Sequence, residues 1–379
     1  MRLFDTARRA VVDFSPGPVV TLYTCGITPY DATHVGHAAT YVLYDVLQRR
    51  LLDLGHEPRC VRNVTDVDDD ILRKARELGV DYRDLAVEET ARFAADMQAL
   101  NVLPVFSEPT ATSAIADIQD FVARVLERGH AYRAGGGVYF SVASFGTFGS
   151  VSHLGREEMR ALAAERGGNP DDPAKRDPLD FVLWQPAAEG EPSWPSPWGP
   201  GRPGWHVECS ALALRELGTT IDLHGGGTDL VFPHHECEAA QSEAATGQPF
   251  VRHWLHAPMV RLAGEKMSKS RGNLVFVSEL VKEHDPMAVR LAILDHGGPA
   301  RPGHAGRRQD GDWHDVLLSA AAGRLAAWRA AGAGDGALVE VRAALDDDLD
   351  LPAALAAVDR AAAAGQGVGE AARLLGVAL

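Results

Sequence analysis

The sequence predicts an α/β fold that combines a parallel, doubly wound sheet with an insertion and a C-terminal α-helical bundle. The first observation is the element order near the N-terminus: a β-branched strand at 19–24, a glycine-containing turn, a helix from about 37 to 54, and a second strand at 59–64. This order is typical of a βαβ unit, whose functional groups lie at the carboxyl ends of the strands. Cys25 and Thr65 directly follow the two predicted strands.

Two changes in composition divide the rest of the chain. Residues 192–201 (PSWPSPWGPG) cannot form a regular element, because proline removes a hydrogen-bond donor and fixes φ. We therefore interpret this region as an insertion, which also holds a helix at 115–126 and a strand at 138–142. After Arg202 the α/β pattern returns with a helix near 210–217 and a strand at 220–223. Beyond about Asp285, Ala, Leu and Arg recur at helical spacing, which predicts the bundle.

These patterns predict five segments. The catalytic sheet domain would occupy 1–110 and 201–260, on either side of a connective insertion at 111–200. Residues 261–290 would form a Lys/Ser-containing loop with the segment that follows it, and 291–379 would form the bundle. A chain of 379 residues is long enough for such a division into two or three modules.

Charge and composition exclude several classes of protein. Lys+Arg 37 against Asp+Glu 52 gives a net charge of −15, so the surface as a whole would repel a phosphate backbone. No stretch approaches the ~18 apolar residues of a membrane span. The four cysteines form no C-x-x-C pair, which argues against a disulfide framework or zinc ribbon. The N-terminus shows no export signal, and we expect a cytoplasmic protein without membrane contact.

Two motifs that lie far apart in the chain predict a nucleotide site. They are His34-Val35-Gly36-His37 and Lys266-Met267-Ser268-Lys269-Ser270. Gly36 would let a nucleotide approach the backbone, while the helix N-terminus and the imidazoles could donate to phosphate oxygens. The lysines would supply positive charge as the transition state forms. Either motif alone could be a capped helix or a solvated loop. Together they resemble the signature of class I aminoacyl-tRNA synthetases and their relatives, which implies a Rossmann-like catalytic domain that forms an acyl-adenylate.

A second group of residues suits a metal ion. Cys25, Cys209, His234 and Glu238 each lie at or near a predicted carboxyl end of a strand. His234 and Glu238 are spaced i,i+4, so both would face one point from a helix, and thiolate, imidazole and carboxylate are ligands of Zn²⁺. A buried cysteine is more often a small hydrophobic residue. Zinc would nevertheless have a purpose here, because it binds a thiolate far better than a hydroxyl and so separates cysteine from serine.

The longer motifs resemble one family. Residues 24–40 (TCGITPYDATHVGHAAT), 63–69 (NVTDVDD) and 223–230 (LHGGGTDL) are similar to cysteinyl-tRNA synthetases, and closer still to their tRNA-independent relatives, the cysteine ligases of mycothiol biosynthesis. Residues 165–170 (ERGGNP) resemble the E-R-G-G-D-P segment of those ligases, with Asn169 in place of Asp. Only about 110 residues follow Lys269, which favours the ligase over a synthetase with an anticodon-reading module.

The resemblance implies roles for particular residues. His34, His37, Lys266 and Lys269 would be catalytic, and Cys25, Cys209 and His234 would hold one Zn²⁺ per chain. Glu238, like His224, follows the spelling of the tRNA synthetases and would be a fourth zinc ligand. Cysteinyl-adenylate would be lined by Gly26, Ile27, Thr28, Thr40, Asn63, Val64, Thr65 and Trp205, with Gly227, Thr228, Asp229 and Val260 around its sugar and base. Asp229 could instead be a helix N-cap. Residues 261–290 would be the KMSKS loop and stem-contact region.

The expected substrates are L-cysteine, ATP with Mg²⁺, and the amine of glucosaminyl-inositol, with no tRNA and a monomeric chain. The cysteine carboxylate would attack the α-phosphorus, and an amine would then displace AMP. Asp66 or Glu208 could take the proton of the amine, or both could be structural. Alternatives are a cysteinyl-tRNA synthetase with a shortened C-terminus, a cysteine ligase for another amine, and a paralogue that has lost catalysis. Residues 295–303 replace an aromatic, basic segment of both relatives, which leaves the acceptor open.

Overall fold

A four-stranded parallel sheet forms the centre of the computed structural model, which describes residues 1–262, 265–267, 273–296 and 311–379. Its strands, in spatial order, are β10 (Trp254–Ala257), β9 (Leu223–Gly227), β3 (Val19–Ile27) and β4 (Glu57–Val64). In the register, Tyr23 of β3 lies opposite Val61 of β4 on one side and His224 of β9 on the other. The predicted α/β class is confirmed.

Helix α1 (Val35–Asp53) connects β3 to β4 and packs beside the sheet. It begins two residues earlier than predicted, because the His34 ring accepts hydrogen bonds from the Gly36 and His37 N–H groups and so caps the helix. The next elements are α2 (Asp69–Leu78) and α3 (Tyr82–Ala99), while β1 (Arg2–Asp5) and β2 (Ala10–Asp13) form a small hairpin before β3.

The position predicted for the third strand was wrong. The sequence favoured 220–223, whereas β9 runs from Leu223 to Gly227 and includes all three glycines. A Cβ atom on Gly225 would lie 1.7 Å from the Leu255 carbonyl oxygen and 2.0 Å from the Tyr44 hydroxyl. Glycine is therefore required where the neighbouring strand and the Tyr44 side chain come this close to the backbone, although its low strand propensity hides this from a sequence pattern.

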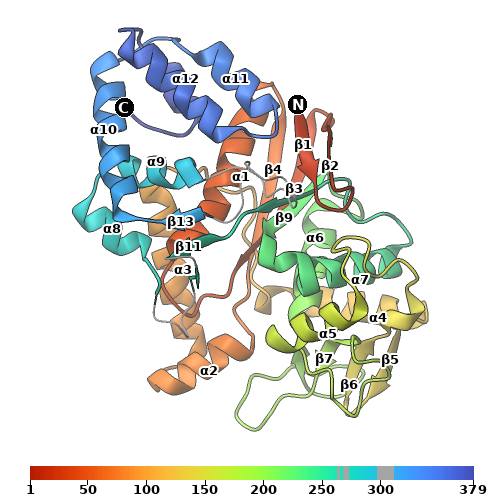
Figure 1. The fold of residues 1–379 in the computed structure, drawn as a ribbon. Helices are drawn as coiled ribbons and strands as arrows, with labels where there is room; N and C mark the ends of the chain where they lie inside the picture. Colours follow the sequence, from red (N-terminus) through yellow and green to blue (C-terminus); the bar gives the residue numbers. More distant parts are fainter. Residues whose placement is uncertain (263–264, 268–272, 297–310) are drawn as a thin grey trace.

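The region between the two halves of the sheet forms its own antiparallel sheet in the order β5-β6-β7-β8 (Figure 1). These strands are β5 (Ala131–Ala134), β6 (Gly137–Phe140), β7 (Phe181–Gln185) and β8 (Arg202–Pro203), accompanied by α4 (Ile115–Glu127) and α5 (Arg156–Glu165). The Pro-rich stretch at 192–201 contains no helix or strand, only an isolated bridge between Trp194 and Gly201. The chain then returns to the central sheet through α6 (Trp205–Leu217) and, after β9, through α7 (Glu236–Thr246).

The last third of the chain is mostly helical. Its helices are α8 (Val277–Glu283), α9 (Pro286–His296), α10 (Asp315–Ala331), α11 (Leu338–Asp346), α12 (Leu351–Ala363) and α13 (Gly369–Leu374). A small sheet places β11 (Val260–Leu262) between β12 (Glu265–Lys266) and β13 (Gly311–Trp313). None of the described helices has the length and apolar character needed to cross a membrane. The predicted domain boundaries stay predictions.

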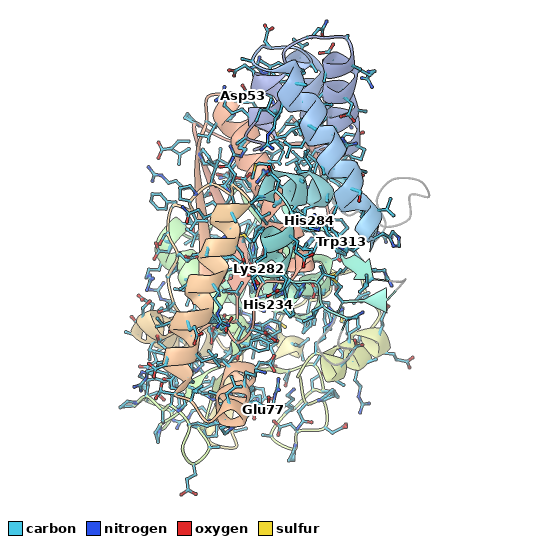
Figure 2. The ribbon with its side chains drawn as sticks, turned by 90° about the vertical axis from the view of Figure 1, so that its left-hand side faces the viewer. Asp53, Glu77, His234, Lys282, His284 and Trp313 are labelled. Carbon is cyan, nitrogen blue, oxygen red and sulfur yellow. The ribbon has the colours of Figure 1, made fainter. Side chains whose placement is uncertain are left out.

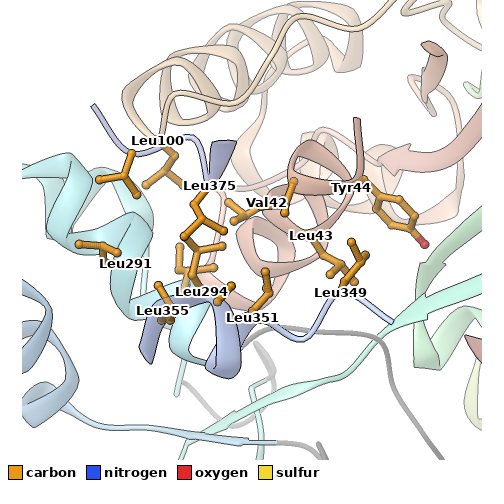
Figure 3. Packing of buried hydrophobic residues seen from close by; sticks show 14 of the residues in the cluster. Val42, Leu43, Tyr44, Leu100, Leu291, Leu294, Leu349, Leu351, Leu355 and Leu375 are labelled. Carbon is orange, nitrogen blue, oxygen red and sulfur yellow. The ribbon is translucent and has the colours of Figure 1, made fainter. Parts of the chain in front are cut away.

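The helical region shares one hydrophobic core with α1. Leu291 and Leu294 of α9 and Leu351 and Leu355 of α12 lie beside Val42 and Leu43 of α1 (Figure 3). Within this core the fully buried Arg290 forms an ion pair with the fully buried Asp45 of α1. Arg290 also donates to the carbonyl oxygens of Leu100, at 2.8 Å, and Leu375, at 3.0 Å. One side chain thus joins α1, the end of α3 and the last helices.

Candidate active site at the carboxyl ends of the central strands

Four buried side chains converge beside the central sheet. Cys25 comes from β3, Cys209 from α6, His234 from the short helical segment η4 (Val231–His235) and Glu238 from α7, and their ligand atoms all lie within 4.8 Å of one another. Cys25 Sγ lies 3.9 Å from Cys209 Sγ and 3.4 Å from Glu238 Oε1. His234 Nε2 lies 3.0 Å from Glu238 Oε1, as the i,i+4 spacing predicts. These four are the residues that the sequence analysis proposed as metal ligands, and Figure 2 shows His234 at mid-height of the molecule.

Local backbone features bring these donors together. The pairing of β3 with β4 is irregular between Thr24 and Ile27, where the Gly26 N–H donates to Asn63 Oδ1 at 2.9 Å. A Cβ atom on Gly26 would lie 1.5 Å from the Asn63 carbonyl oxygen, so only glycine fits beside Cys25. The chain turns again at Phe232, whose extended φ of −140° interrupts the helix before His234.

The electrostatics of this cluster favour the anionic forms of Glu238 and Cys209. Burial alone would raise the pKa of Glu238, but the His224 and His234 rings lower it well below its usual range. Burial alone would lower the pKa of His234, but Glu238 and Cys209 raise it to about 10. Burial opposes the thiolate of Cys209, yet its contacts with Cys25 and His234 lower its pKa to about 6. A carboxylate and a thiolate beside an imidazolium are the forms that a metal cation could bind once the His234 proton leaves.

A buried histidine network surrounds the cluster, and sequence reasoning largely missed it. His224 Nε2 lies 3.0 Å from Glu238 Oε2, and His235 Nε2 lies 3.3 Å from Cys25 Sγ. His235 Nδ1 in turn lies 2.7 Å from His256 Nε2. The donor atoms of a second set also lie within 4.8 Å of one another, and two of its members belong to the first set. The second set is Cys25, His224, His235 and Glu238. The doubled histidine in the F-P-H-H run was the available signal for His235, whereas nothing in the sequence pattern marked His256.

The predicted nucleotide motif lies at the N-terminus of α1. The rings of His34 and His37 stack with their centroids 3.8 Å apart, and His37 is exposed. The Val35 N–H donates to the Val275 carbonyl, and the Val277 N–H donates to the Thr33 carbonyl. The chain just after the lysine motif is therefore held beside this turn. Lys266 lies in β12, and its backbone is opposite Arg261 in the antiparallel pairing of β12 with β11. Lys269 and the 297–302 loop lie outside the described residues.

The residues proposed to line the adenylate lie along the same strand ends. Gly26, Ile27 and Thr28 are at the end of β3, Asn63, Val64 and Thr65 at the end of β4, Gly227, Thr228 and Asp229 at the end of β9, and Val260 just beyond β10. Thr40 donates to the Gly36 carbonyl in α1, and the Trp205 ring lies 4.3 Å from the His234 ring between centroids. Asp229 lies inside a short helical turn, not at its N-cap.

Arg166 is a further residue that sequence reasoning did not assign to the site. It follows α5 in the insertion and donates to the carbonyl oxygens of Asp229 and Phe232. Gly167, with φ +86°, ends the helix, and the Gly168 N–H returns to the Ala163 carbonyl at 2.8 Å. The E-R-G-G sequence therefore stops a helix and directs an arginine to the loop between β9 and His234.

This parallel sheet, with a histidine-capped helix at its edge, is the catalytic fold of class I tRNA synthetases. Residues 13–297 match the family model described as the tRNA synthetases class I (C) catalytic domain. The fold also resembles Mycobacterium tuberculosis methionyl-tRNA synthetase in complex with methionyl-adenylate, with a TM-score of 0.67, 18% identity, and coverage of 90% of this chain and 82% of that chain. At this identity the likeness concerns the fold alone.

Relatives with about half of their residues identical show to which family within the class I tRNA synthetases the chain belongs. The chain is 52% identical to the L-cysteine:1D-myo-inositol 2-amino-2-deoxy-alpha-D-glucopyranoside ligase of Thermobispora bispora, over 96% of this chain and 90% of the relative. The ligase of the same name from Salinispora tropica is 50% identical, over 98% and 93%. The chain belongs to this family of cysteine ligases within the class I tRNA synthetases. Its predicted family and its assignment as an enzyme of the ligase class are confirmed.

Proposed function

We propose that the protein activates L-cysteine with ATP and joins it to the amine of 1D-myo-inositol 2-amino-2-deoxy-alpha-D-glucopyranoside. The observation that carries this proposal is the buried cluster of two thiols, an imidazole and a carboxylate. It lies at the strand ends beside the histidine-capped helix of a chain that matches such ligases over nearly its whole length. The cluster supports cysteine as the amino acid, and the relatives support the aminosugar as the acceptor.

Cys25, Cys209, His234 and Glu238 would hold one Zn²⁺. Two thiols, one imidazole and one carboxylate are a suitable zinc donor set, and their buried, converging atoms fit a single small cation. When bound, zinc would supply selectivity for a thiol over a hydroxyl, which apolar contacts alone provide only weakly. The histidines behind the cluster would orient the donors, because hydrogen bonds to a ligand fix its tautomer and direction.

In the first half-reaction the cysteine carboxylate attacks the α-phosphorus of ATP. A carboxylate oxygen–phosphorus bond forms, the bond to the bridging oxygen breaks, and pyrophosphate leaves with Mg²⁺. The carboxylate is already ionised, so the step requires positioning and charge stabilisation more than a base. We assign these tasks to the N-terminus of α1, His34, His37, and the lysines Lys266 and Lys269.

In the second half-reaction the neutral amine of the aminosugar attacks the activated carbonyl. A carbon–nitrogen bond forms, the bond to the adenylate oxygen breaks, AMP leaves, and the nitrogen releases one proton to solvent. Asp66 accepts hydrogen bonds from the backbone N–H and the hydroxyl of Thr112, which hold this carboxylate in place. A monomeric state, independence from tRNA and a cytoplasmic location stay predictions from the sequence.

The test is cysteine-dependent AMP formation by zinc-replete protein, with the aminosugar as acceptor in one reaction and tRNA in another. Serine in place of cysteine and a chelator-treated sample are the controls. Turnover with the aminosugar and cysteine supports the proposal. Turnover with tRNA alone would instead identify a cysteinyl-tRNA synthetase. Pyrophosphate exchange without turnover in either reaction would mean that a different amine is the acceptor.

A further inference from the structure

Glu208 is a buried carboxylate without an ordinary partner. It lies in the first turn of α6, directly before Cys209, and is 0% exposed. Neither oxygen accepts a hydrogen bond of normal geometry from any residue that the structure describes, and Thr65 provides only a weak polar contact. The equally buried Glu236, in contrast, accepts three backbone N–H groups, at 2.7, 3.1 and 2.8 Å. An unpaired buried carboxylate is costly, so its presence here indicates a missing partner.

The surroundings of Glu208 are acidic. Cys209, Asp68 and Asp66 are the charged groups that act on it, and it forms no ion pair within the described part of the chain. Asp68 and Asp66 come from the loop after β4 and are only half-buried, so they are open to a ligand. Asp68 accepts from the Ile71 N–H at 2.9 Å and from the Thr28 hydroxyl at 3.0 Å, which fixes its position. This side of the site therefore gathers carboxyl groups whose ionised forms a bound cation would stabilise.

The arrangement does not suit a second metal ion. Among the described residues, three or more His, Cys, Asp or Glu donors come within 4.8 Å of one another only in the two groups at the cysteine cluster, and Glu208, Asp66 and Asp68 belong to neither. Divalent cations need donors that converge on one point. An ammonium group carries three N–H donors that point in different directions, so separated acceptors can share it.

We propose that Glu208, together with Asp66 and Asp68, forms a subsite for the primary ammonium group of a substrate. This inference rests on the proposed function, because both the amino acid and the acceptor of that reaction carry a primary amine. The α-ammonium group of substrate cysteine is three bonds from its sulfur. A substrate whose sulfur binds beside Cys209 therefore brings its ammonium group close to residue 208. The acceptor amine must approach the same carboxyl carbon. Both sources share one chemistry, and the experiment separates them.

The experiment compares Glu208→Gln, which keeps the shape and removes the charge, with Glu216→Gln. Glu216 lies two turns further along α6 and pairs with Arg215 at the surface. Calorimetry measures binding of cysteine and of 3-mercaptopropionate, which lacks the amine, to the zinc-loaded proteins without ATP or acceptor. Steady-state kinetics then give KM for the acceptor. The binding measurement needs no turnover, so it tests the subsite even if the proposed acceptor is wrong.

Weaker cysteine binding in Glu208→Gln by about tenfold or more, with 3-mercaptopropionate unchanged, assigns the subsite to the α-ammonium of cysteine. An acceptor KM raised by about the same factor, with cysteine binding unchanged, assigns it to the acceptor amine. If neither quantity differs from that of Glu216→Gln while zinc content is preserved, the proposal is overturned. If Glu208→Gln does not fold, Asp68→Asn replaces it. Cysteine binding should then weaken, or the acceptor KM should rise, and no difference from Glu216→Gln in either quantity would overturn the proposal.

Discussion

Replacing Arg290 with methionine should weaken the contact between the helical region and the sheet domain and lower the free energy of unfolding. Methionine keeps most of the apolar volume but removes the ion pair with Asp45 and the hydrogen bonds to the Leu100 and Leu375 carbonyls. Removing one partner of a buried pair typically costs about 3–5 kcal/mol. Asp45 would keep Arg49, at 2.8 Å, and the Leu103 N–H, at 2.8 Å, so we expect a loss at the lower end, about 3 kcal/mol.

Urea unfolding followed by tryptophan fluorescence measures this loss, because Trp313 and Trp328 are buried in the helical region. With a slope of roughly 3 kcal/mol per molar urea, the midpoint should fall by about 1 M. Arg342→Met is the control, since Arg342 pairs with Asp53 at the surface, and an exposed pair contributes little to stability. An Arg290→Met midpoint equal to that of the control would refute the reasoning that this buried pair joins the two regions.

Three other substitutions test the site and its surroundings. Cys209→Ser should lose stoichiometric zinc and cysteine-dependent pyrophosphate exchange together, whereas Cys237→Ser should keep both; zinc retained by Cys209→Ser would contradict the ligand assignment. Arg166→Met should raise KM for ATP by about tenfold, because it frees the carbonyl groups of Asp229 and Phe232. Arg160→Met, within α5, should leave KM unchanged, and equal KM values for the two variants would remove Arg166 from the site. Burial raises the pKa of Asp96 from 3.8 to about 6, so the folded state binds this proton more tightly than the unfolded state and stability is lost as pH rises through that interval. The Tm of Asp96→Asn should therefore rise relative to that of the parent between about pH 4.5 and 7. A Tm difference that stays constant over this range would exclude the effect.

Elements with a clear periodicity could be read from the sequence. The predicted strands at 19–24 and 59–64 fall within β3 and β4, and the helix at 115–126 differs from α4 by one residue. The strand made of Gly225, Gly226 and Gly227 could not, because its reason is the close approach of Leu255 and Tyr44 from other parts of the chain. Propensity describes a residue and its neighbours in sequence, whereas this strand is determined by neighbours in space.

Some residues of the site could also be predicted from the sequence, whereas others depend on neighbours in space. The four proposed ligands could be selected because their chemistry is rare and because parallel strands end at one edge. His256 could not be selected, since its role depends on a 2.7 Å contact with His235 from an adjoining element. Glu208 appeared in the sequence only as one of two candidate bases, and its lack of a partner became visible only when its burial was known.

The burial of Arg290 also has a consequence for synthesis of the chain. Its acceptor on Leu375 lies 85 residues further along. At about 5–20 residues per second, a ribosome needs about 4–17 s to make that stretch. During this interval one of the final acceptors of the guanidinium group has not been synthesised. The apolar face of α1 is also not yet covered by α12 and α13. The nascent sheet domain should therefore be a client for chaperones that shield apolar surface until the later helices emerge.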